Sequence, residues 1–236
     1  MRPHTLAVII PAHNEEALLS EALEAIRTAS RHPALQRVRV LTVVAADSCV
    51  DGTAATAWQT GAQVVPVSYR NPGRARAAAA DLALKTMGGP AGCWLASTDA
   101  DSTVPPSWLA FQYARACEGW DAVVGTVTVT DWPPHVPGLA GRHHRHYDAT
   151  RPAHGPWLHP HVHGANLGVR AEAYTAVGGF PPLGAGEDHG LVAALSAGRH
   201  RILRTSDCPV VTSGRLHPRA RGGFGNHLAR LALEED

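Results

Sequence analysis

The chain has 236 residues, of which 44% are hydrophobic and 17% charged, and its formal net charge is +1. This length and composition fit a single α/β domain that buries a sizeable core. The near-neutral charge gives no electrostatic case for nucleic acid or an anionic membrane as the main partner.

No apolar run approaches the roughly 18 residues of a membrane-spanning helix, and the N-terminal stretch lacks the apolar region of a signal peptide. The four cysteines are scattered without Cys-x-x-Cys spacing. We therefore expect reduced, mostly buried thiols in a cytoplasmic protein without a transmembrane segment.

The first structural signal is an unbroken apolar run over residues 6–10, followed directly by Pro-Ala-His-Asn-Glu-Glu at 11–16. Such a run fits a strand that is covered on both faces, as in a parallel sheet. We expect Pro11 to end the strand and Asn14 to cap the next helix, whose positive end suits the two glutamates. Capping alone accounts for Asn14 and Glu15, so the local sequence leaves a binding role for them open.

A second strand is predicted over residues 38–44, with Asp47 in its exit loop. Asp51 can start the following helix, whereas Asp47 has no obvious structural role. A carboxylate at the end of a strand can accept a hydrogen bond from a ribose hydroxyl or a base N–H, but aspartate is also an ordinary turn residue.

Residues 63–67 predict a short third strand, and Pro66 within it favours an edge or end position. An alanine-rich helix follows over residues 71–87, with Arg74 and Arg76 in its first turn. The helix dipole disfavours cations there. These arginines therefore either bind a neighbouring phosphate or carboxylate, or they cover apolar surface with their side chains.

The apolar residues 93–96 predict a fourth strand, and Asp99 and Asp101 follow it directly. In a parallel α/β sheet, ligands bind just beyond the carboxyl ends of the strands. Two carboxylates there can hold a hard divalent cation, with its other positions left for water and phosphate oxygens. An isolated Asp-x-Asp is more often a solvated turn, so its context decides.

Strands and helices alternate through this first half, which predicts right-handed βαβ units and an α/β fold with a mostly parallel sheet flanked by helices. Several strand-end loops then carry acids on one rim: Glu15, Asp47, Asp99 and Asp101. The first loop lacks Gly-x-Gly-x-x-Gly, which argues against a nicotinamide dehydrogenase, and no Gly-x-x-x-x-Gly-Lys-Ser/Thr supports a P-loop NTPase.

In the second half, residues 123–130 alternate and predict a strand with one exposed face. Residues 131–163 break this pattern with many prolines and with aromatic and histidine residues that include Trp132, Trp157, His143, His144, His159, His161 and His163. Without cysteines or a defined ligand spacing, a metal cluster is the weaker interpretation. We expect a mobile loop with a helix over residues 142–148, which covers the cleft and touches an acceptor.

Residues 163–170 predict a further strand and residues 171–177 a helix, before Glu187 and Asp188 at the start of another helix. Capping needs only one of these two acids, so a general base at a cleft is the functional interpretation. Two last short strands are predicted at 202–203 and 210–212. The basic segment 213–225 either folds over a diphosphate or is solvated.

Five motifs occur in order: Pro-Ala-His-Asn-Glu-Glu, Asp-x-x-x-Asp-Gly-Thr at 47–53, Asp-x-Asp at 99–101, Gly-Gly-Phe at 178–180 and Glu-Asp at 187–188. Together they resemble a family 2 glycosyltransferase with the GT-A fold over residues 5–225. The resemblance implies metal-assisted transfer of a hexose, with inversion, from a UDP or GDP sugar to an acceptor hydroxyl, with Mg²⁺ or Mn²⁺ as the cofactor.

The same resemblance implies roles for individual residues. Donor binding falls to Pro11, His13, Asn14, Glu15, Asp47, Arg74, Asp99 and Asp101. Asp101 and Asp99 would hold the metal, with His217 as a candidate third ligand, and Asp188 would be the base with Glu187 in support. Asn166 and His189 are the candidate acceptor-side residues. The single domain would divide into a nucleotide-sugar half (1–102), an acceptor and catalytic half (103–225) and a C-terminal helix or tail (226–236).

Two departures from the common pattern concern donor identity and acceptor-side detail. The usual Asp-Asp-Gly-Ser loop is Ala-Asp-Ser-Cys at 46–49, and the usual arginine after Glu-Asp gives way to the apolar residues 191–195. Three alternatives stay open. They are a nucleotide-sugar binding protein without transfer activity, a nucleotidyltransferase, and a retaining GT-A enzyme of the glucosyl-phosphoglycerate synthase kind. The nucleotidyltransferase would need a Gly-rich first loop with arginine and a later lysine, which the sequence lacks.

Overall fold

The computed structural model describes residues 2–217, 219 and 222–234. These form one mixed sheet of eight strands in the order β3-β2-β1-β4-β7-β6-β8-β5. The strand bounds are β1 (Thr5–Ala12), β2 (Arg39–Asp47), β3 (Gln63–Val67), β4 (Cys93–Ser97), β5 (Ser102–Thr103), β6 (Ala122–Thr128), β7 (Leu167–Arg170) and β8 (Ile202–Thr212).

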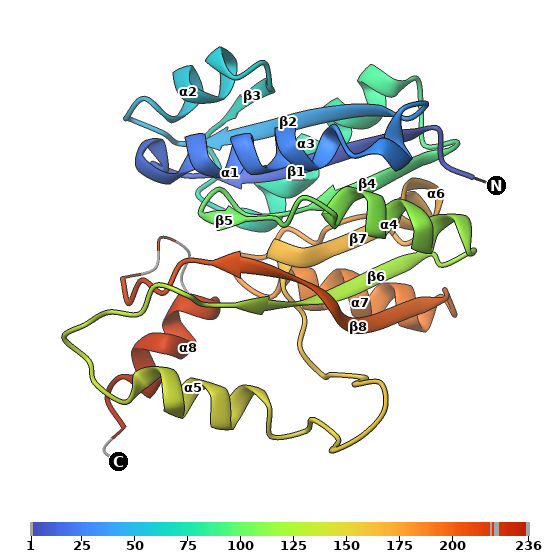
Figure 1. The fold of residues 1–236 in the computed structure, drawn as a ribbon. Coiled ribbons are helices and arrows are strands. Elements are labelled where there is room, and N and C mark those ends of the chain that lie inside the picture. Colours follow the sequence, from blue (N-terminus) through green and yellow to red (C-terminus); the bar gives the residue numbers. More distant parts are fainter. Residues whose placement is uncertain (1, 218, 220–221, 235–236) are drawn as a thin grey trace.

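Helices flank the sheet on both sides and extend beyond one end (Figure 1). Their bounds are α1 (Glu16–Ser30), η1 (Pro33–Leu35), α2 (Thr53–Gln59), α3 (Pro72–Met87), α4 (Trp108–Cys117), α5 (Leu139–Tyr147), η2 (Gly164–Asn166), α6 (Ala171–Ala176), α7 (Glu187–Ala197) and α8 (Phe224–Leu231). No helix of the described residues is long and apolar enough to cross a membrane.

The sheet is parallel in its first half and mixed in its second. β1 pairs in parallel with β2 and β4, and β2 with β3, so the carboxyl ends of β1, β2 and β4 lie at one edge. β7 runs antiparallel between β4 and β6, whereas β8 is parallel to β6. The mostly parallel α/β fold expected from the sequence is confirmed, with β3 at the sheet edge as Pro66 indicated.

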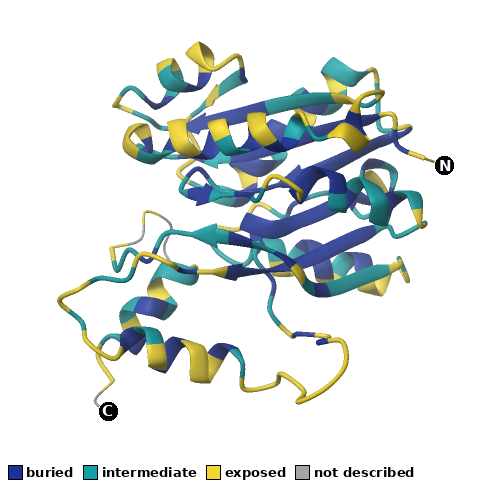
Figure 2. Cartoon of the chain, in the orientation of Figure 1, coloured by how far each residue is buried: buried dark blue, intermediate teal, exposed yellow. Residues whose placement is uncertain are grey.

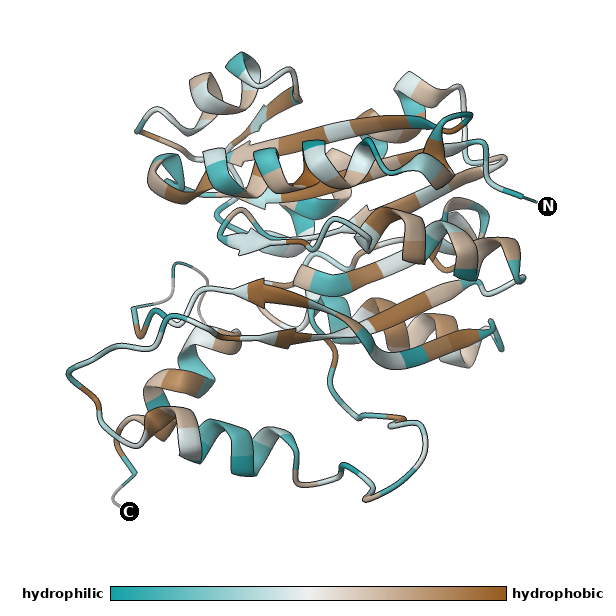
Figure 3. Cartoon of the chain, viewed as in Figure 1, coloured by the Kyte–Doolittle hydropathy of each residue, from teal (hydrophilic) through white to brown (hydrophobic). Residues whose placement is uncertain are grey.

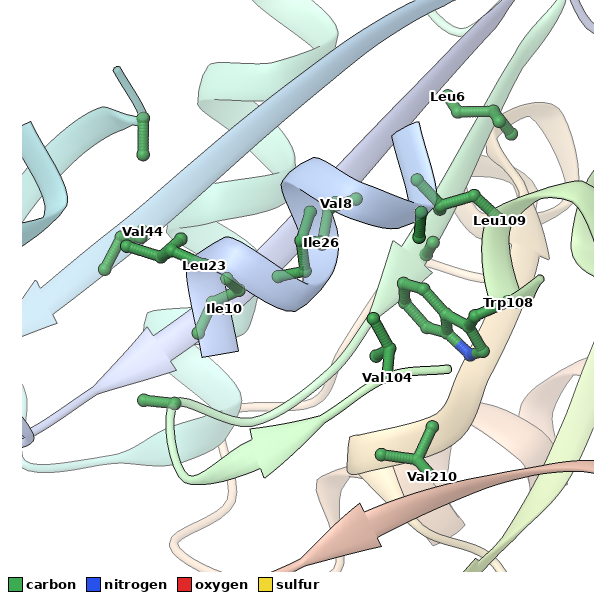
Figure 4. Packing of buried hydrophobic residues seen from close by; sticks show 14 of the residues in the cluster. Leu6, Val8, Ile10, Leu23, Ile26, Val44, Val104, Trp108, Leu109 and Val210 are labelled. Atoms are coloured by element: carbon green, nitrogen blue, oxygen red, sulfur yellow. The ribbon is translucent and has the colours of Figure 1, made fainter. Parts of the chain in front are cut away.

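Two large apolar clusters lie one on each face of the sheet, and a third, smaller cluster holds Val127, Tyr147, Trp157 and Ala165. Leu6, Val8 and Ile10 of β1 pack against α1 and α4, as Figure 4 shows for Ile26 and Trp108. The intervening Ala7 and Ile9 pack on the opposite face, which α3, α6 and α7 cover. Buried and hydrophobic residues therefore concentrate in the strands, with exposed and polar residues on the outer helix faces (Figures 2 and 3).

Some local predictions are wrong. Pro11 does not end β1, which continues to Ala12. Asn14 is not a helix cap: α1 begins at Glu16, and Asn14 has a left-handed backbone (φ 52°) because its Oδ1 accepts the Val50 N–H across two loops at 2.9 Å. α4 follows the Asp-x-Asp loop without having been anticipated.

The second half contains two more corrections. β6 has no exposed face before Thr128, because it lies inside the sheet between β7 and β8, with the core clusters on both sides. The two short strands expected near the end of the chain are one strand, β8, whose pairing with β6 shifts register between Gly125 and Val127. The expected C-terminal helix or tail at 226–236 overlaps α8, and its residues 235 and 236 lie outside the described part of the chain.

The four cysteines are free thiols. Cys93 and Cys208 are buried, whereas Cys49 and Cys117 are half-buried.

Candidate active site

A cavity of about 1260 Å³ opens beyond the carboxyl ends of β1, β2 and β4. On one side it is lined by four acids from three strand ends, here called the acid rim: Glu15, Asp47, Asp99 and Asp101. On the other side lie five rings, here called the ring wall: Tyr147, His161, His163, Phe224 and His227. Glu187 and Asp188 border the space between the two sides.

Asp47 has a structural role that its sequence context did not reveal. Its carboxylate accepts the backbone N–H groups of Tyr69, Arg70 and Asn71 at 2.6, 2.8 and 2.9 Å. Burial alone would raise the pKa of Asp47, but these bonds together hold it below its usual value. Asp47 therefore fixes the turn that leads into α3 and borders the cavity.

Glu15 and Asp101 are joined by arginines from the C-terminal segment. Arg215 makes a bidentate contact with Glu15, at 2.7 and 3.1 Å, and reaches Asp101 at 2.8 Å. Arg219 also contacts the Glu15 carboxylate. Burial and the neighbouring Asp99 charge raise the pKa of Asp101 to about 6, which Arg215 partly opposes. The basic segment thus lies over the acid rim; its Arg221 is outside the described residues.

Arg76 is the buried cation at the centre of the site. It forms ion pairs with Asp99 on the acid rim and with Glu187, the latter at 2.9 Å. Burial alone would lower the pKa of Arg76, but the two carboxylates raise it above its usual value. The sequence did contain a signal for this residue, a cation placed against the helix dipole, but not the identity of its partners.

Asp188 contrasts with its neighbour Glu187. Its Oδ2 accepts the Gly164 N–H and its Oδ1 the His189 N–H, both at 2.8 Å. Among the described residues, no arginine or lysine pairs with this carboxylate. The Asp188 carboxylate is therefore held in place by backbone N–H groups and borders the cavity.

The structure places the remaining predicted residues in two groups. Pro11, His13, Asn14 and His189 line the cavity, and His13 Nδ1 lies 2.6 Å from the Asp47 carbonyl oxygen.

Arg74, Asn166 and His217 are not among the lining residues. Arg74 lies over the Tyr69 ring at 4.1 Å, and His217 is exposed. Asn166 is buried, where it accepts from Trp108 Nε1 and donates to the Thr126 and Cys208 carbonyls.

The ring wall comes from the histidine-rich stretch and α8. Tyr147 stacks on His161, with ring centroids 3.9 Å apart, and its hydroxyl accepts the Val127 N–H and bonds His163 Nε2 at 3.0 Å. Burial lowers the pKa of His163 to about 3. Burial also lowers the pKa of His161 and His227, so the imidazoles of the wall are mostly uncharged at neutral pH, and Tyr147 joins the wall to β6 through the Val127 N–H.

The acids of the Asp-x-Asp loop suit a hard divalent cation. Among the described residues, no group of three or more His, Cys, Asp and Glu side chains is arranged to hold a metal. Mg²⁺, however, is often held by one or two carboxylates plus substrate phosphates. Asp99 and Asp101 repel each other, which raises the pKa of Asp101, so a cation bound between them would relieve that repulsion. The residues fit a metal that completes its coordination with the ligand.

Solved structures with the GT-A fold share this architecture. The mannosyltransferase of Pyrobaculum calidifontis, in complex with GDP-Man and Mn²⁺, aligns with a TM-score of 0.61 and 22% identity over 89% of this chain and 57% of its own. Residues 1–349 of S. aureus TarS, in complex with UDP-GlcNAc, align with a TM-score of 0.64 and 16% identity over 97% and 65%. Glucosyl-3-phosphoglycerate synthase from Mycobacterium tuberculosis aligns with a TM-score of 0.57 and 21% identity over 97% of this chain and 76% of its own.

The described residues thus have the fold of the GT-A glycosyltransferases. The family model of glycosyl transferase family 2 matches residues 7–178, and the chain belongs to that family. The resemblance seen in the sequence motifs is confirmed. Among curated proteins, none matches this sequence. The chain spans less than two thirds of the mannosyltransferase and of TarS.

Proposed function

We propose that this chain transfers a hexosyl group from a UDP or GDP sugar to an acceptor hydroxyl, with inversion at the anomeric carbon and with Mg²⁺ or Mn²⁺ as cofactor. One observation carries the proposal. In a single cavity, Glu15, Asp99, Asp101 and Glu187 are paired with arginines, whereas the Asp188 carboxylate has no ion pair among the described residues and accepts two backbone N–H groups. The half at 1–102 would bind the donor and the half at 103–225 the acceptor.

The acid rim with its arginines suits a diphosphate. Asp99 and Asp101 would hold the metal, which when bound acts as a Lewis acid on the leaving diphosphate. Arg215 and Arg219 lie on the same rim and can exchange the Glu15 carboxylate for phosphate oxygens, since guanidinium binds both. Pro11, His13 and Asn14 line the part of the cavity where the nucleoside would lie.

Asp188 is suited to be the general base. Its two backbone N–H bonds leave carboxylate lone pairs for a hydroxyl on the cavity side. The acceptor proton would pass to Asp188 as the acceptor oxygen attacks the anomeric carbon and the nucleoside diphosphate leaves on the opposite face. One such displacement inverts the anomeric configuration.

GDP-Man and UDP-GlcNAc, the ligands of two GT-A neighbours, define the first donors to test. A thermal-shift screen of UDP-glucose, UDP-GlcNAc and GDP-mannose, with and without Mn²⁺, should give a metal-dependent rise in melting temperature with at least one of them. If none stabilises the chain, the proposed donor class is wrong.

The stereochemistry is tested with the donor that binds. Proton NMR of the sugar released in slow donor hydrolysis should show the inverted anomer first. A retained anomer would instead support the retaining alternative, whose solved example is among the neighbours. Donor binding without hydrolysis or transfer would support a binding protein.

A further inference from the structure

Arg76 connects the two halves of the cavity. It is the fifth residue of α3, and its guanidinium lies beneath the site, where it is 4% exposed. The neighbouring face of α3 is made of small residues, with Ala75, Ala79, Ala80 and Ala83 buried against the sheet. This close packing leaves the long arginine stem pointing along the sheet toward the strand ends.

The guanidinium donates to three separate parts of the chain, which are residues 97–99, Gly164 and Glu187. Nη1 contacts Ser97 Oγ at 2.8 Å and the Thr98 carbonyl at 3.3 Å, both at the end of β4. Nη2 pairs with Asp99, and Nε donates to Glu187 Oε1 at 2.9 Å. A lysine has a single nitrogen and cannot reproduce this fork.

Gly164 extends the network to the proposed base. Its carbonyl lies 3.4 Å from Arg76 Nη1, and its N–H donates to Asp188 Oδ2 at 2.8 Å. A Cβ at Gly164 would collide with the guanidinium, so the backbone there approaches Arg76 more closely than any other residue type permits. Arg76 therefore reaches Asp188 by two routes: through Gly164, and through Glu187, the residue before it.

Burying an arginine is costly, and apolar residues of similar volume often stabilise a fold equally well. The hydrogen bonds of the Arg76 guanidinium go to residues 97–99, Gly164 and Glu187, and of these Asp99, Gly164 and Glu187 border the cavity. This arrangement indicates that Arg76 serves the geometry of the site more than the stability of the fold. We propose that Arg76 is a positioning residue: it holds Glu187 and, through Gly164, Asp188 at a fixed distance from the donor carboxylates on the acid rim. This inference rests on the proposed function of the same site.

The test compares Arg76→Met and Arg76→Lys with the unchanged chain. The assay is hydrolysis of UDP-glucose, UDP-GlcNAc or GDP-mannose, whichever the unchanged chain cleaves. A displacement of about 1 Å at a reacting group can cost about 100-fold in rate. We therefore expect kcat to fall about 100-fold in Arg76→Met and about 10-fold in Arg76→Lys. The donor KM should change less than kcat, because Asp99 contacts Arg76 but the other donor-side residues Glu15, Asp101 and Arg215 do not.

Arg170→Met is the matched control. Arg170 also pairs with an aspartate, Asp121 at 3.5 Å, and with the Ala116 carbonyl at 2.8 Å, but it lies away from the cavity. Its loss should lower the melting temperature without changing kcat. Millimolar guanidinium should restore part of the lost kcat in Arg76→Ala but not alter Arg170→Ala. Equal kcat in Arg76→Met and the unchanged chain would overturn the positioning role.

Two further outcomes keep the proposal separable from the proposed function. If Arg76→Met does not fold, Glu187→Gln takes its place, because this substitution removes one ion pair of Arg76 with little change of shape. A kcat of Glu187→Gln equal to that of the unchanged chain would again overturn the inference. If the unchanged chain binds and cleaves none of the three donors, the proposed function fails and the role of Arg76 fails with it.

Discussion

The acid rim and the ring wall face each other across one cavity but consist of different kinds of side chain. The rim consists of carboxylates at the ends of β1, β2 and β4, and each is matched by arginines or by backbone N–H groups. The wall consists of stacked, uncharged rings from α5, α8 and the stretch between α5 and η2. The rim suits a charged ligand, and the wall suits a neutral one.

The difference also concerns how each side is attached. Rim residues follow strands directly, so the parallel sheet fixes them. Wall residues depend on side-chain hydrogen bonds, such as those from the Val127 N–H to the Tyr147 hydroxyl at 3.1 Å and between this hydroxyl and His163 Nε2 at 3.0 Å. The position of the rim is thus tied to the fold, whereas the position of the wall is tied to contacts that sequence changes can alter separately.

The largest expected effect concerns the residues between the two sides. Asp188→Asn should lower the transfer rate about 10²–10⁴-fold, as loss of a general base does. Nucleotide affinity should survive, because Asp188 does not belong to the rim. Glu187→Gln should lower the transfer rate less than Asp188→Asn does. Steady-state kinetics with calorimetry of nucleotide binding measure both; transfer by Asp188→Asn at the unchanged rate would assign the base to another residue.

The next effect concerns the charge of the rim. Asp101→Ala should remove the Mn²⁺ dependence of UDP or GDP binding, because Asp101 is the proposed metal ligand. Arg215→Met should strengthen binding of Mn²⁺ alone, because Arg215 now pairs with Asp101 at 2.8 Å, and should weaken binding of the nucleotide. Titration calorimetry with Mn²⁺ alone, with nucleotide alone and with both together measures the metal affinity and the nucleotide affinity separately. Unchanged metal dependence in Asp101→Ala would show that the metal does not bind at the rim.

Acidification should change the free energy of unfolding in opposite directions through one group on each side of the cavity, His163 on the ring wall and Asp101 on the acid rim. The pKa of His163 is lowered to about 3 by burial, so the unfolded chain binds its proton first and stability is lost as the pH falls below about 6.5. Between pH 7.5 and pH 5 this amounts to at most about 2 kcal/mol. The pKa of Asp101 is raised to about 6, so its unfavourable charge in the folded chain is relieved over the same range.

Urea unfolding at pH 7.5 and pH 5 tests this opposition. His163→Gln should reduce the loss of stability on acidification, and Asp101→Asn should increase it. Identical pH dependence in both variants and the unchanged chain would show that neither group titrates as its burial implies.

The smallest expected effect is dynamic. Residues 148–158 are largely exposed, whereas His159 and His161 are anchored by hydrogen bonds to β6, β8 and Tyr147. Without acceptor, amide hydrogen exchange should be faster over residues 148–158 than in β1, with residues 159–163 between them. Exchange as slow as in β1 throughout 131–163 would contradict the expected mobile cover.

The sequence was most informative where function follows a strand directly. The acids at 15, 47, 99 and 101 could be placed on one rim because each comes after an apolar run, and α3 and β3 were predicted within a residue of their bounds. It was least informative where partners are distant. Nothing local to Arg76 indicates Glu187, 111 residues away, and no pattern showed that β6 would lie inside the sheet between β7 and β8, with a core cluster on each face.

The contact between Arg215 and Glu15 joins residues 200 positions apart. Chains emerge from the ribosome N-terminal end first, and local regions can begin to fold during synthesis. The parallel strands β1 to β4 can therefore assemble while Glu15 and Asp101 still lack their guanidinium partners. Arg215 and Arg219 are synthesised 200 and 204 residues after Glu15, so until then Glu15 and Asp101 are accessible to cations from the surroundings.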